Sequence, residues 1–283
     1  MNKNILKWSA LGLAAGAGLV LLDALFLEQY FFRVKKFDIG IRGGQKQLKI
    51  LLLTDLHLKQ RLSLFHARLA RHINRMQPHL ILISGDLLDD DGSASTMEQF
   101  LSAIHRHIPK AAIMGNHDHR AEVSNSNIER IYQKHNCQLL VNRSHAFELD
   151  GVRMMVTGLD DFIEGTHRFT EAVQDVGYEE HHLLLVHSPL QQEQALADMQ
   201  RINLARPKGE RLNISYLFAG HNHGGQVRIL GYAPVLPEMS GNYVNGWYNS
   251  SFPLLYVSKG FGTTSRPIRF GARSEITLFN YYA

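Results

Sequence analysis

The chain has 283 residues, of which 45% are hydrophobic, and carries a formal net charge of +4 at pH 7. This apolar content is enough to build a sizeable core and excludes an intrinsically disordered chain. The positive charges are spread along the sequence without dense runs of Lys and Arg, which argues against a protein that binds nucleic acid. The single cysteine, Cys137, excludes an intrachain disulfide framework and a zinc site built from thiolates.

The first 36 residues are predicted to form a membrane anchor with a juxtamembrane segment. Residues 8–22 are uncharged, and a helix extended to residue 27 would be about 30 Å long, enough to cross the hydrocarbon core of a bilayer. A cleaved signal peptide and a buried core helix remain as alternatives. The run lacks a clear A-x-A cleavage site, and its many Gly and Ala residues are more typical of a membrane helix. We expect residues 30–39, YFFRVKKFDI, to lie at the membrane interface.

The expected location is the bacterial inner membrane, with a single N-terminal anchor. Basic residues flank the apolar run on both sides, so the charge difference that sets its orientation is small, and it favours a globular domain on the cytoplasmic side. Residues 37–283 contain no internal repeat, low-complexity tract or long linker, which predicts one globular domain after the anchor.

From residue 48 onward, short apolar runs alternate with stretches of helical periodicity. This order of strand, helix and strand predicts an α/β fold with parallel strands joined by right-handed crossovers. The second half of the chain has further strand-like segments with few helices between them, which predicts a second, mixed sheet packed on the first. The expected strands are 48–54, 80–84, 111–115, 152–159, 183–186, 214–219, 225–230, 254–260 and 275–282.

Side chains of the types that bind metals follow five of these strands. In chain order they are Asp55, His57, Asp86, Asn116, His187, His221 and His223. The carboxyl ends of parallel strands meet at one edge of a sheet, so these side chains are expected to lie together. Each residue alone is explained as easily by a helix cap or a histidine bonded to backbone or water, but five such strand ends are not. Asp55 and Asp86 would also repel each other unless a cation lay between them.

The residue types indicate the kind of metal. Carboxylate, amide and imidazole groups without a thiolate favour Mn, Fe or Zn, whereas Ca and Mg prefer more oxygen ligands. Seven ligands are too many for one such ion and enough for two ions that share a bridging carboxylate. Two ions about 3.5 to 4 Å apart activate water and neutralise phosphoryl oxygens, so the pattern predicts displacement at phosphorus.

Five motifs in order, LTDLHL, SGDLLDD, GNHDH, VHSP and GHNHGGQ, resemble the signature of the calcineurin-like metallophosphoesterases. The resemblance covers residues 48–281. The segments GLDD, GGQVRI and 255–279 are similar to a membrane-linked branch that includes YkuE-like and YaeI-like phosphoesterases. The same branch contains a lipid A enzyme that hydrolyses UDP-2,3-diacylglucosamine. The chain departs from this branch at Asn222, where threonine is usual, and it lacks the twin-arginine signal of some relatives.

The resemblance implies a four-layer αββα sandwich that holds two divalent transition-metal ions, with Mn favoured over Fe or Zn. The ligands that it implies are Asp55, His57 and His223 for the first ion, Asn116, His187 and His221 for the second, and Asp86 as the bridge between them.

The resemblance also implies that His117 is the catalytic histidine, and imidazole titrates in the range useful for protonating a leaving oxygen. Asp118 either holds the ring of His117 in the correct tautomer or is a structural residue of a tight loop. His119, Arg266 and Arg269 are candidates for substrate contacts, with surface or salt-bridge roles as the alternative. The three aspartates at 89–91 are interpreted as a solvated loop.

These expectations describe a membrane-anchored enzyme that hydrolyses a phosphodiester or pyrophosphate bond by attack of a metal-bridged hydroxide. The hydrophobic N-terminus and the resemblance favour a phosphorylated, amphiphilic substrate such as UDP-2,3-diacylglucosamine. Hydrolysis of small or nucleotide phosphodiesters is the alternative. A non-catalytic scaffold that binds metal is a hypothesis of another class, and the complete set of seven ligands together with His117 argues against it.

Overall fold

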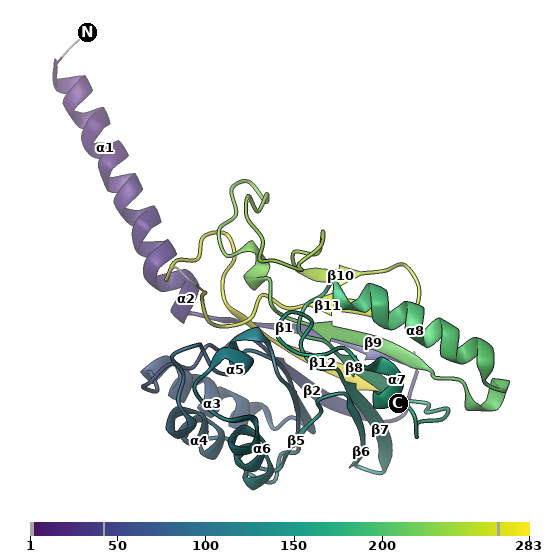
Figure 1. Cartoon of the computed structure of the whole chain (residues 1–283). Coiled ribbons are helices and arrows are strands. Elements are labelled where there is room, and N and C mark those ends of the chain that lie inside the picture. Colours follow the sequence, from purple (N-terminus) through teal and green to yellow (C-terminus); the bar gives the residue numbers. More distant parts are fainter. Residues whose placement is uncertain (1–2, 42, 265–266) are drawn as a thin grey trace.

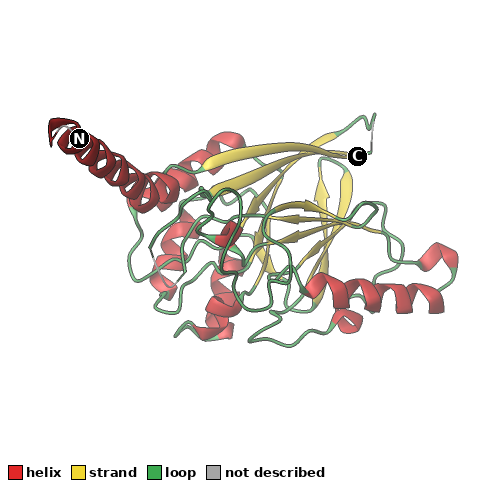
Figure 2. Ribbon diagram, turned by 90° about the horizontal axis from the view of Figure 1, so that it is seen from above, coloured by secondary structure: helices red, strands yellow, loops and turns green. Residues whose placement is uncertain are grey.

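Two six-stranded sheets lie face to face at the centre of the molecule, and helices cover the outer side of each (Figure 1, Figure 2). The computed structural model describes residues 3–41, 43–264 and 267–283. Both sheets are largely parallel, so their carboxyl ends lie at one edge and position the candidate ligands there.

The first sheet comes mainly from the N-terminal half of the chain. Its strands, in spatial order, are β1 (Arg33–Gly40), β12 (Glu275–Tyr282), β2 (Gln47–Leu53), β3 (Leu80–Ser84), β4 (Lys110–Ile113) and β5 (Cys137–Leu139). The parallel strands β2 to β5 are joined through α3 (Leu64–Met76), α4 (Ala94–Ser102), α5 (Asn116–Arg120) and α6 (Asn125–Lys134). Ser63 and Ser93 begin α3 and α4 by accepting hydrogen bonds from backbone N–H groups of the first turn.

The second sheet comes from the C-terminal half. Its strands, in spatial order, are β10 (Gly246–Tyr248), β11 (Leu254–Val257), β9 (Ile214–Ala219), β8 (His182–Leu185), β7 (Val152–Gly158) and β6 (Arg143–Leu149). The inner strands are parallel, and the edge strands β10 and β6 are antiparallel to their neighbours. The helical segments of this half are α7 (Phe169–Ala172), α8 (Gln191–Ala205), η2 (Lys208–Glu210) and η3 (His223–Gly225).

Three apolar clusters hold these layers together. In β2, Leu51 and Leu53 face α3 and α4, while Ile50 and Leu52 face the second sheet, because alternate side chains of a strand point to opposite faces. The third cluster lies between the second sheet and the helices α7 and α8. The order helix, sheet, sheet, helix is the four-layer α/β architecture predicted above, and that prediction is confirmed.

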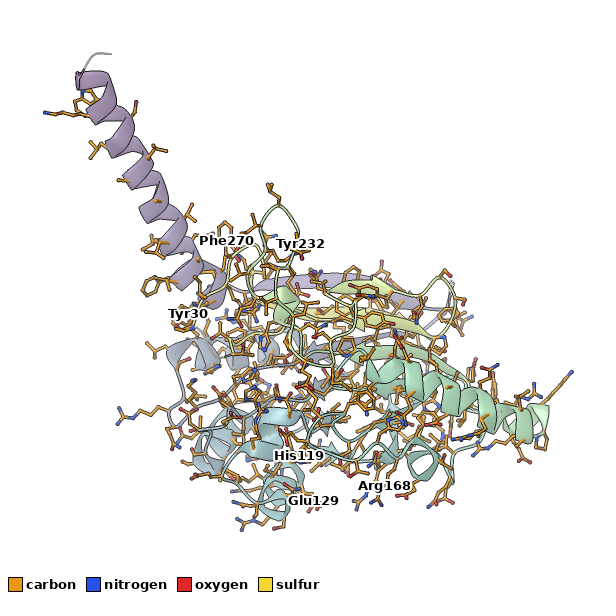
Figure 3. The ribbon with its side chains drawn as sticks, turned by 45° about the horizontal axis from the view of Figure 1, so that its top comes forward. Tyr30, His119, Glu129, Arg168, Tyr232 and Phe270 are labelled. Atoms are coloured by element: carbon orange, nitrogen blue, oxygen red, sulfur yellow. The ribbon has the colours of Figure 1, made fainter. Side chains whose placement is uncertain are left out.

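The N-terminal segment consists of α1 (Lys3–Leu22), a π-helical turn η1 (Asp23–Leu27) and α2 (Glu28–Tyr30). Among the described residues, one helix is long and apolar enough to cross a membrane, Lys7–Tyr30, and most of its side chains are exposed. Figure 1 shows α1 projecting away from the sheets. At its base, the Glu28 carboxylate accepts a hydrogen bond from Ala272 N (2.8 Å), and Tyr30 stacks on Phe65 with ring centroids 4.1 Å apart (Figure 3).

The expectation that residues 30–39 lie at a membrane interface is wrong for most of that segment. From Arg33 onward the chain forms β1, which pairs with β12 along its whole length of eight residues. Phe37 packs against the apolar cluster between the sheets. Backbone pairing and this burial favour the sheet over the lipid interface. The division between anchor and domain at residues 36 and 37 therefore falls inside β1.

The expected strand at residues 225–230 is also wrong. Within the described chain, this segment makes two isolated bridges, Val227 to Phe270 and Ile229 to Tyr232, and joins neither sheet. Positive φ angles at Gly225 (77°) and Leu230 (50°) turn the backbone away from an extended path. The segment instead forms a projecting hairpin.

Candidate metal centre

The candidate ligands lie at the ends of five strands from both sheets, and the fold brings them together. Those of the first sheet follow β2, β3 and β4, and those of the second sheet follow β8 and β9. All seven are buried: Asp55, His57, Asp86, Asn116, His187, His221 and His223. Buried carboxylates and imidazoles at this density require a compensating charge or a complete hydrogen-bond network.

Three side chains form the first group. Nε2 of His57 lies 3.2 Å from Nε2 of His223, and the latter atom lies 3.7 Å from Oδ1 of Asp55. Thr54 donates a hydrogen bond of 2.6 Å to Oδ2 of Asp55, and the backbone N–H of His221 donates to Oδ1 at 3.0 Å. The Asp55 carboxylate is thus held in place, with one oxygen beside two converging imidazole nitrogens.

The second group centres on His187. Its Nε2 lies 3.2 Å from Oδ1 of Asn116 and 3.2 Å from Oδ2 of Asp86. The His221 ring packs edge-on against the His187 ring, with centroids 5.1 Å apart. Ligand atoms of Asp86, His187 and His221 all lie within 4.8 Å of one another, a separation that one cation can span.

Asp86 stands between the two groups. The Oδ2 atom that faces His187 also lies 3.6 Å from Nε2 of His57, and Oδ1 accepts a hydrogen bond of 2.9 Å from the backbone N–H of His117. Burial would raise the pKa of Asp86, but His187 and then His57 and His117 outweigh burial and hold it below its usual range. Asp86 is therefore placed to share its charge between both groups.

Hydrogen bonds between the candidate histidine ligands and backbone carbonyls support the same arrangement. Nδ1 of His187 lies 2.9 Å from the Ser84 carbonyl, and Nε2 of His221 lies 2.7 Å from the Glu238 carbonyl. A ring N–H donated to a carbonyl fixes the tautomer and leaves the other nitrogen free to bind a metal, as in most histidine ligands. Within the described part of the chain, the buried Nδ1 of His57 has no hydrogen-bond partner, although Asp89 lies 3.6 Å away. This donor set fits two divalent cations.

The backbone of the site is strained. Five of the seven candidate ligands have positive φ angles, a region that few non-glycine residues occupy: Asp55 (53°), His57 (48°), Asp86 (51°), His221 (69°) and His223 (48°). Such strain persists where the surrounding structure enforces it and concentrates at functional sites. Position 115 has room only for glycine, because a Cβ there would lie 2.7 Å from Cε1 of His187.

His117 lines the entrance to the site from α5. Its Nδ1 lies 2.7 Å from Oδ1 of Asp90 and 3.2 Å from Oδ1 of Asp89, although its ring N–H points directly at neither oxygen. Burial opposes protonation of His117, but the neighbouring Asp89, followed by Asp86 and Asp90, outweighs burial and raises its pKa. Arg120 joins the same cluster, with Nε 3.0 Å from Asp90.

The carboxylate of Asp118 bonds to backbone groups and not to the ring of His117. Its buried carboxylate accepts hydrogen bonds from the backbone N–H groups of Leu88 (2.8 Å), Gly115 (3.0 Å) and Leu87 (3.3 Å). Burial and then the charge of Asp86 raise the pKa of Asp118 to about 6. Of the two interpretations of Asp118, the structural one matches these contacts, since the carboxylate ties the loops after β3 and β4 together.

Arg269 is fully buried, which contradicts the expected substrate contact. Its guanidinium donates to the carbonyls of Gly262 (2.8 Å), Ala272 (2.7 Å) and Lys259 (2.9 Å), and Nη2 lies 3.1 Å from Nδ1 of His223. Burial lowers the pKa of Arg269 to about 10, so the group stays charged at neutral pH. The expected salt bridge is also not seen among the described residues, because carbonyls take its place. Arg269 supports His223 from behind.

The other two candidates for substrate contacts gain no support. His119 pairs with Asp160 at 2.8 Å, and although burial opposes it, this carboxylate raises the pKa of His119. Nε2 of His119 is thus paired with a carboxylate of the protein itself. Arg266 lies outside the described residues.

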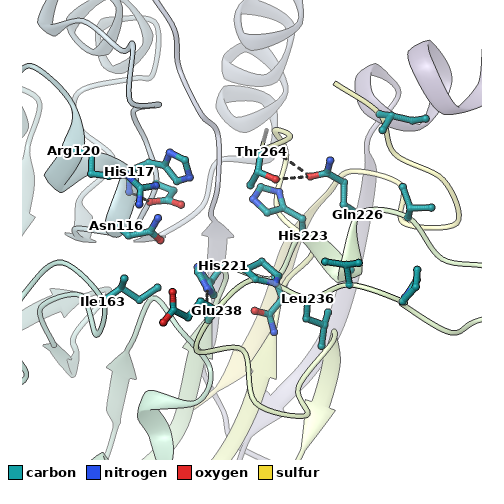
Figure 4. A pocket seen from close by; sticks show the side chains of 18 residues that line it. Asn116, His117, Arg120, Ile163, His221, His223, Gln226, Leu236, Glu238 and Thr264 are labelled. Atoms are coloured by element: carbon teal, nitrogen blue, oxygen red, sulfur yellow. Dashed lines mark hydrogen bonds between the residues drawn. The ribbon is translucent and has the colours of Figure 1, made fainter. Parts of the chain in front are cut away.

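A cavity of about 560 Å³ opens beside the candidate ligands (Figure 4). Its polar side carries Asp86, Asn116, His117, Arg120, His221 and His223. Apolar residues also line it, namely Val227, Pro234, Val235, Leu236, Pro237 and Ile268, while Ile163 lies beside Asn116 (Figure 4). The cavity therefore offers a charged end at the candidate metal centre and an apolar wall leading away from it.

Three residues of this site were missed from the sequence. The sequence predicts a solvated loop at Asp89 and Asp90, yet Asp89 is buried and both carboxylates face His117. No motif marks Arg120, although it directly follows GNHDH and lines the cavity. The only sequence signal for Asp89 is its position three residues after the candidate ligand Asp86, in the same motif.

Comparison with known proteins identifies the family. The model described as calcineurin-like phosphoesterase matches residues 48–225, more than half of the chain. The chain is 26% identical to YpbG of Bacillus subtilis (strain 168), covering 84% of this chain and 83% of YpbG. It is also 26% identical to the metallophosphoesterase YkuE of that strain, with coverages of 90% and 87%. A transmembrane protein with a metallophosphoesterase domain from Bos taurus is 27% identical, with coverages of 83% and 53%. The chain therefore belongs to the calcineurin-like phosphoesterases and is a hydrolase.

Proposed function

We propose that the protein is a two-metal phosphoesterase that hydrolyses a phosphodiester or pyrophosphate bond in an amphiphilic, membrane-associated substrate. The observation that carries the proposal is the convergence of seven buried donors, four of which line a cavity that also has an apolar wall: Asp86, Asn116, His221 and His223. UDP-2,3-diacylglucosamine, an intermediate of lipid A biosynthesis, has this combination of pyrophosphate and acyl chains and is the specific substrate that we propose.

The residues divide into two sets of metal ligands. Asp55, His57 and His223 would hold one ion, Asn116, His187 and His221 the other, and Asp86 both. Bound divalent cations, with Mn²⁺ proposed ahead of Fe²⁺ or Zn²⁺, would neutralise phosphoryl oxygens and lower the pKa of a water molecule. The strained, glycine-lined backbone fixes these side chains before substrate arrives, which reduces the reorganisation that the reaction requires.

His117 is the group that we assign to proton transfer. Its Nδ1 faces Asp90 and Asp89, which leaves Nε2 to donate a proton to the leaving oxygen. Arg120 lies on the same wall of the cavity and supplies a guanidinium for the phosphoryl group. We assign Arg120 the phosphate-binding role that the sequence suggested for Arg266 and Arg269.

The cavity volume constrains how an amphiphilic substrate binds. About 560 Å³ is typical of sites for small molecules and is filled by a phosphorylated headgroup. Acyl chains would then have to leave along the apolar wall. The same volume suits a small or nucleotide phosphodiester with no lipid part, which makes such esters the second candidate substrate.

The helix Lys7–Tyr30 supports a membrane location, and the bovine relative is named a transmembrane protein. We propose that α1 anchors the enzyme in the bacterial inner membrane, with the sheets on the cytoplasmic side. The orientation is tested by introducing a cysteine at the surface of the globular domain. Its reaction with a membrane-impermeant reagent is then compared in intact and in permeabilised cells. Labelling of intact cells would contradict the cytoplasmic side.

The substrate is tested with the detergent-solubilised chain loaded with Mn²⁺. Turnover of UDP-2,3-diacylglucosamine and of bis(4-nitrophenyl) phosphate is compared for the wild type, His117→Ala and Asp86→Ala. We expect the lipid nucleotide to be the better substrate and both variants to turn it over at least about 100-fold more slowly than the wild type. Rapid turnover of the diester alone would reject the lipid substrate. Equal, negligible turnover by all three proteins would instead indicate a non-catalytic scaffold.

A further inference from the structure

The segment 226–235 forms a short hairpin above the cavity. Ile229 and Tyr232 exchange two backbone hydrogen bonds, of 2.9 and 3.0 Å. Between them, Leu230 (φ 50°) and Gly231 (φ 87°) form a two-residue turn with the positive φ angles of tight hairpins. The tip thus has a defined conformation, although it contains a leucine where glycine or asparagine is usual.

Side-chain hydrogen bonds brace this hairpin from inside. The guanidinium of Arg228 donates from Nη2 (2.8 Å) and Nε (3.2 Å) to the carbonyl of Gly231, and from Nη1 to Oδ1 of Asn245 (2.7 Å). Gln226, at the base, accepts from the backbone N–H and the hydroxyl of Thr264. These hydrogen bonds hold the hairpin in one conformation.

Its outward side chains are apolar and exposed. Leu230 is fully exposed at 103%, Val235 at 76%, Tyr232 at 71% and Ile229 at 59%. Single exposed apolar residues are ordinary, whereas several gathered on one braced projection mark an interaction surface. An aliphatic tip followed by a tyrosine is the composition that settles at a lipid interface.

The hairpin is tied to the base of the candidate membrane helix. Its stem pairs with Phe270, which donates to the carbonyl of Gln226 (2.9 Å) and accepts from the N–H of Arg228 (2.7 Å). The adjacent Arg269 N–H donates to the carbonyl of Ala24 in η1 (3.0 Å). Figures 1 and 3 show the hairpin with Tyr232 projecting on the same side of the sheets as α1.

We propose that the 226–235 hairpin is a second membrane contact, which inserts its apolar tip into the lipid bilayer that α1 spans. This inference rests on the proposed anchor and is independent of hydrolysis. Val235 belongs both to the exposed hairpin and to the apolar wall of the cavity, together with Val227. Insertion would therefore place the apolar side of the cavity against lipid, where acyl chains of a bound substrate remain in the membrane.

The test measures the depth of a fluorophore on the full-length chain in phosphatidylglycerol-containing vesicles. Leu230→Cys, Leu204→Cys and Leu13→Cys are labelled one at a time with an environment-sensitive dye and quenched by lipids with spin labels at known depths. Leu204, 76% exposed on α8, is the matched control away from the hairpin, and Leu13 on α1 reports the anchor. Cys137 is buried, and burial raises the pKa of its thiol, so the introduced cysteine is the reactive one.

The proposal predicts a blue-shifted emission at position 230 and a loss of fluorescence that is largest with shallow spin labels. Position 13 should be quenched most by deep labels, and position 204 by none. Quenching at 13 without quenching at 230 would overturn the hairpin contact and keep the anchor. Quenching at neither position would overturn both, and none of these outcomes depends on enzymatic turnover. A tip covered by a protein partner instead would give the unquenched result at position 230.

Discussion

Two adjacent segments after β9 reverse the usual pattern of burial in opposite ways. His221 and His223 are polar and almost fully buried, whereas Leu230 and Tyr232, a few residues later, are apolar and exposed. Globular proteins normally place these residue types the other way round. Positive φ angles occur in both segments, so neither is a relaxed loop. Under the two proposals made above, each reversal marks a surface that is completed from outside the chain, by metal ions in one case and by lipid in the other.

The largest effect is expected from Asp86→Asn. Loss of the shared carboxylate charge should lower metal affinity by more than the roughly 10- to 100-fold that is typical when a residue hydrogen-bonded to a metal ligand is changed. The measurement is the metal content of purified protein after gel filtration, together with turnover. Asp91→Asn is the matched control, because that side chain is 57% exposed. A variant that retained two metals and full activity would break the metal half of the comparison.

His117→Ala should lower kcat by about 10²- to 10⁴-fold without loss of metal, since general acid catalysis contributes about that much. His119→Ala is a control two residues away, in which the ring faces Asp160. We expect it to keep kcat within a few fold. Equal losses in both variants would mean that His117 acts through the structure of α5 and not through proton transfer.

A buried histidine outside the metal centre sharpens the comparison. His182 bonds to Thr157 (2.7 Å), and burial lowers its pKa to about 3. The folded-state pKa lies below the value of 6.5 for an exposed ring, so the contribution of His182 to the free energy of unfolding is fully present above pH 6.5. This contribution falls by about 1.4 kcal/mol per pH unit as the pH drops towards 3.

His182→Gln should therefore make the free energy of unfolding less sensitive to acid in that range, measured by urea denaturation at several pH values. His107→Gln, at an exposed position, is the control. If the His182 variant kept the wild-type slope, the ring would not be neutral and buried as described.

The smallest effect on stability is expected from Leu230→Asp. This side chain contacts solvent on all sides, so the free energy of unfolding in detergent should change by less than about 0.5 kcal/mol. Thermal or chemical denaturation of the solubilised chain measures it. A loss of several kcal/mol would show that the leucine packs within the protein, and the exposed half of the comparison would fail.

The sequence predicted the fold and the clustering of the candidate ligands because both depend on local signals. Apolar runs that end in Asp55, Asp86 or His187 show where strands stop, and parallel topology then brings these ends to one edge. The candidate metal site can therefore be predicted from short motifs, without any knowledge of long-range contacts.

The remaining features depend on contacts between distant parts of the chain. Arg33 to Gly40 form a strand only because β12, some 240 residues later, supplies the partner. Arg269 is buried because carbonyls from three separate positions surround it, which no local pattern reveals. Residues 225–230 have the composition of a strand, but positive φ angles at Gly225 and Leu230 turn the backbone, and the segment joins neither sheet.

The central claim is that the seven buried donors hold two metal ions. The most direct measurement is the metal-to-protein ratio of the active, full-length chain, determined by elemental analysis after titration with Mn²⁺ and removal of excess metal. We expect two ions per active chain, with turnover that rises as the second ion binds. Full activity at one ion per chain, or with none, would contradict it.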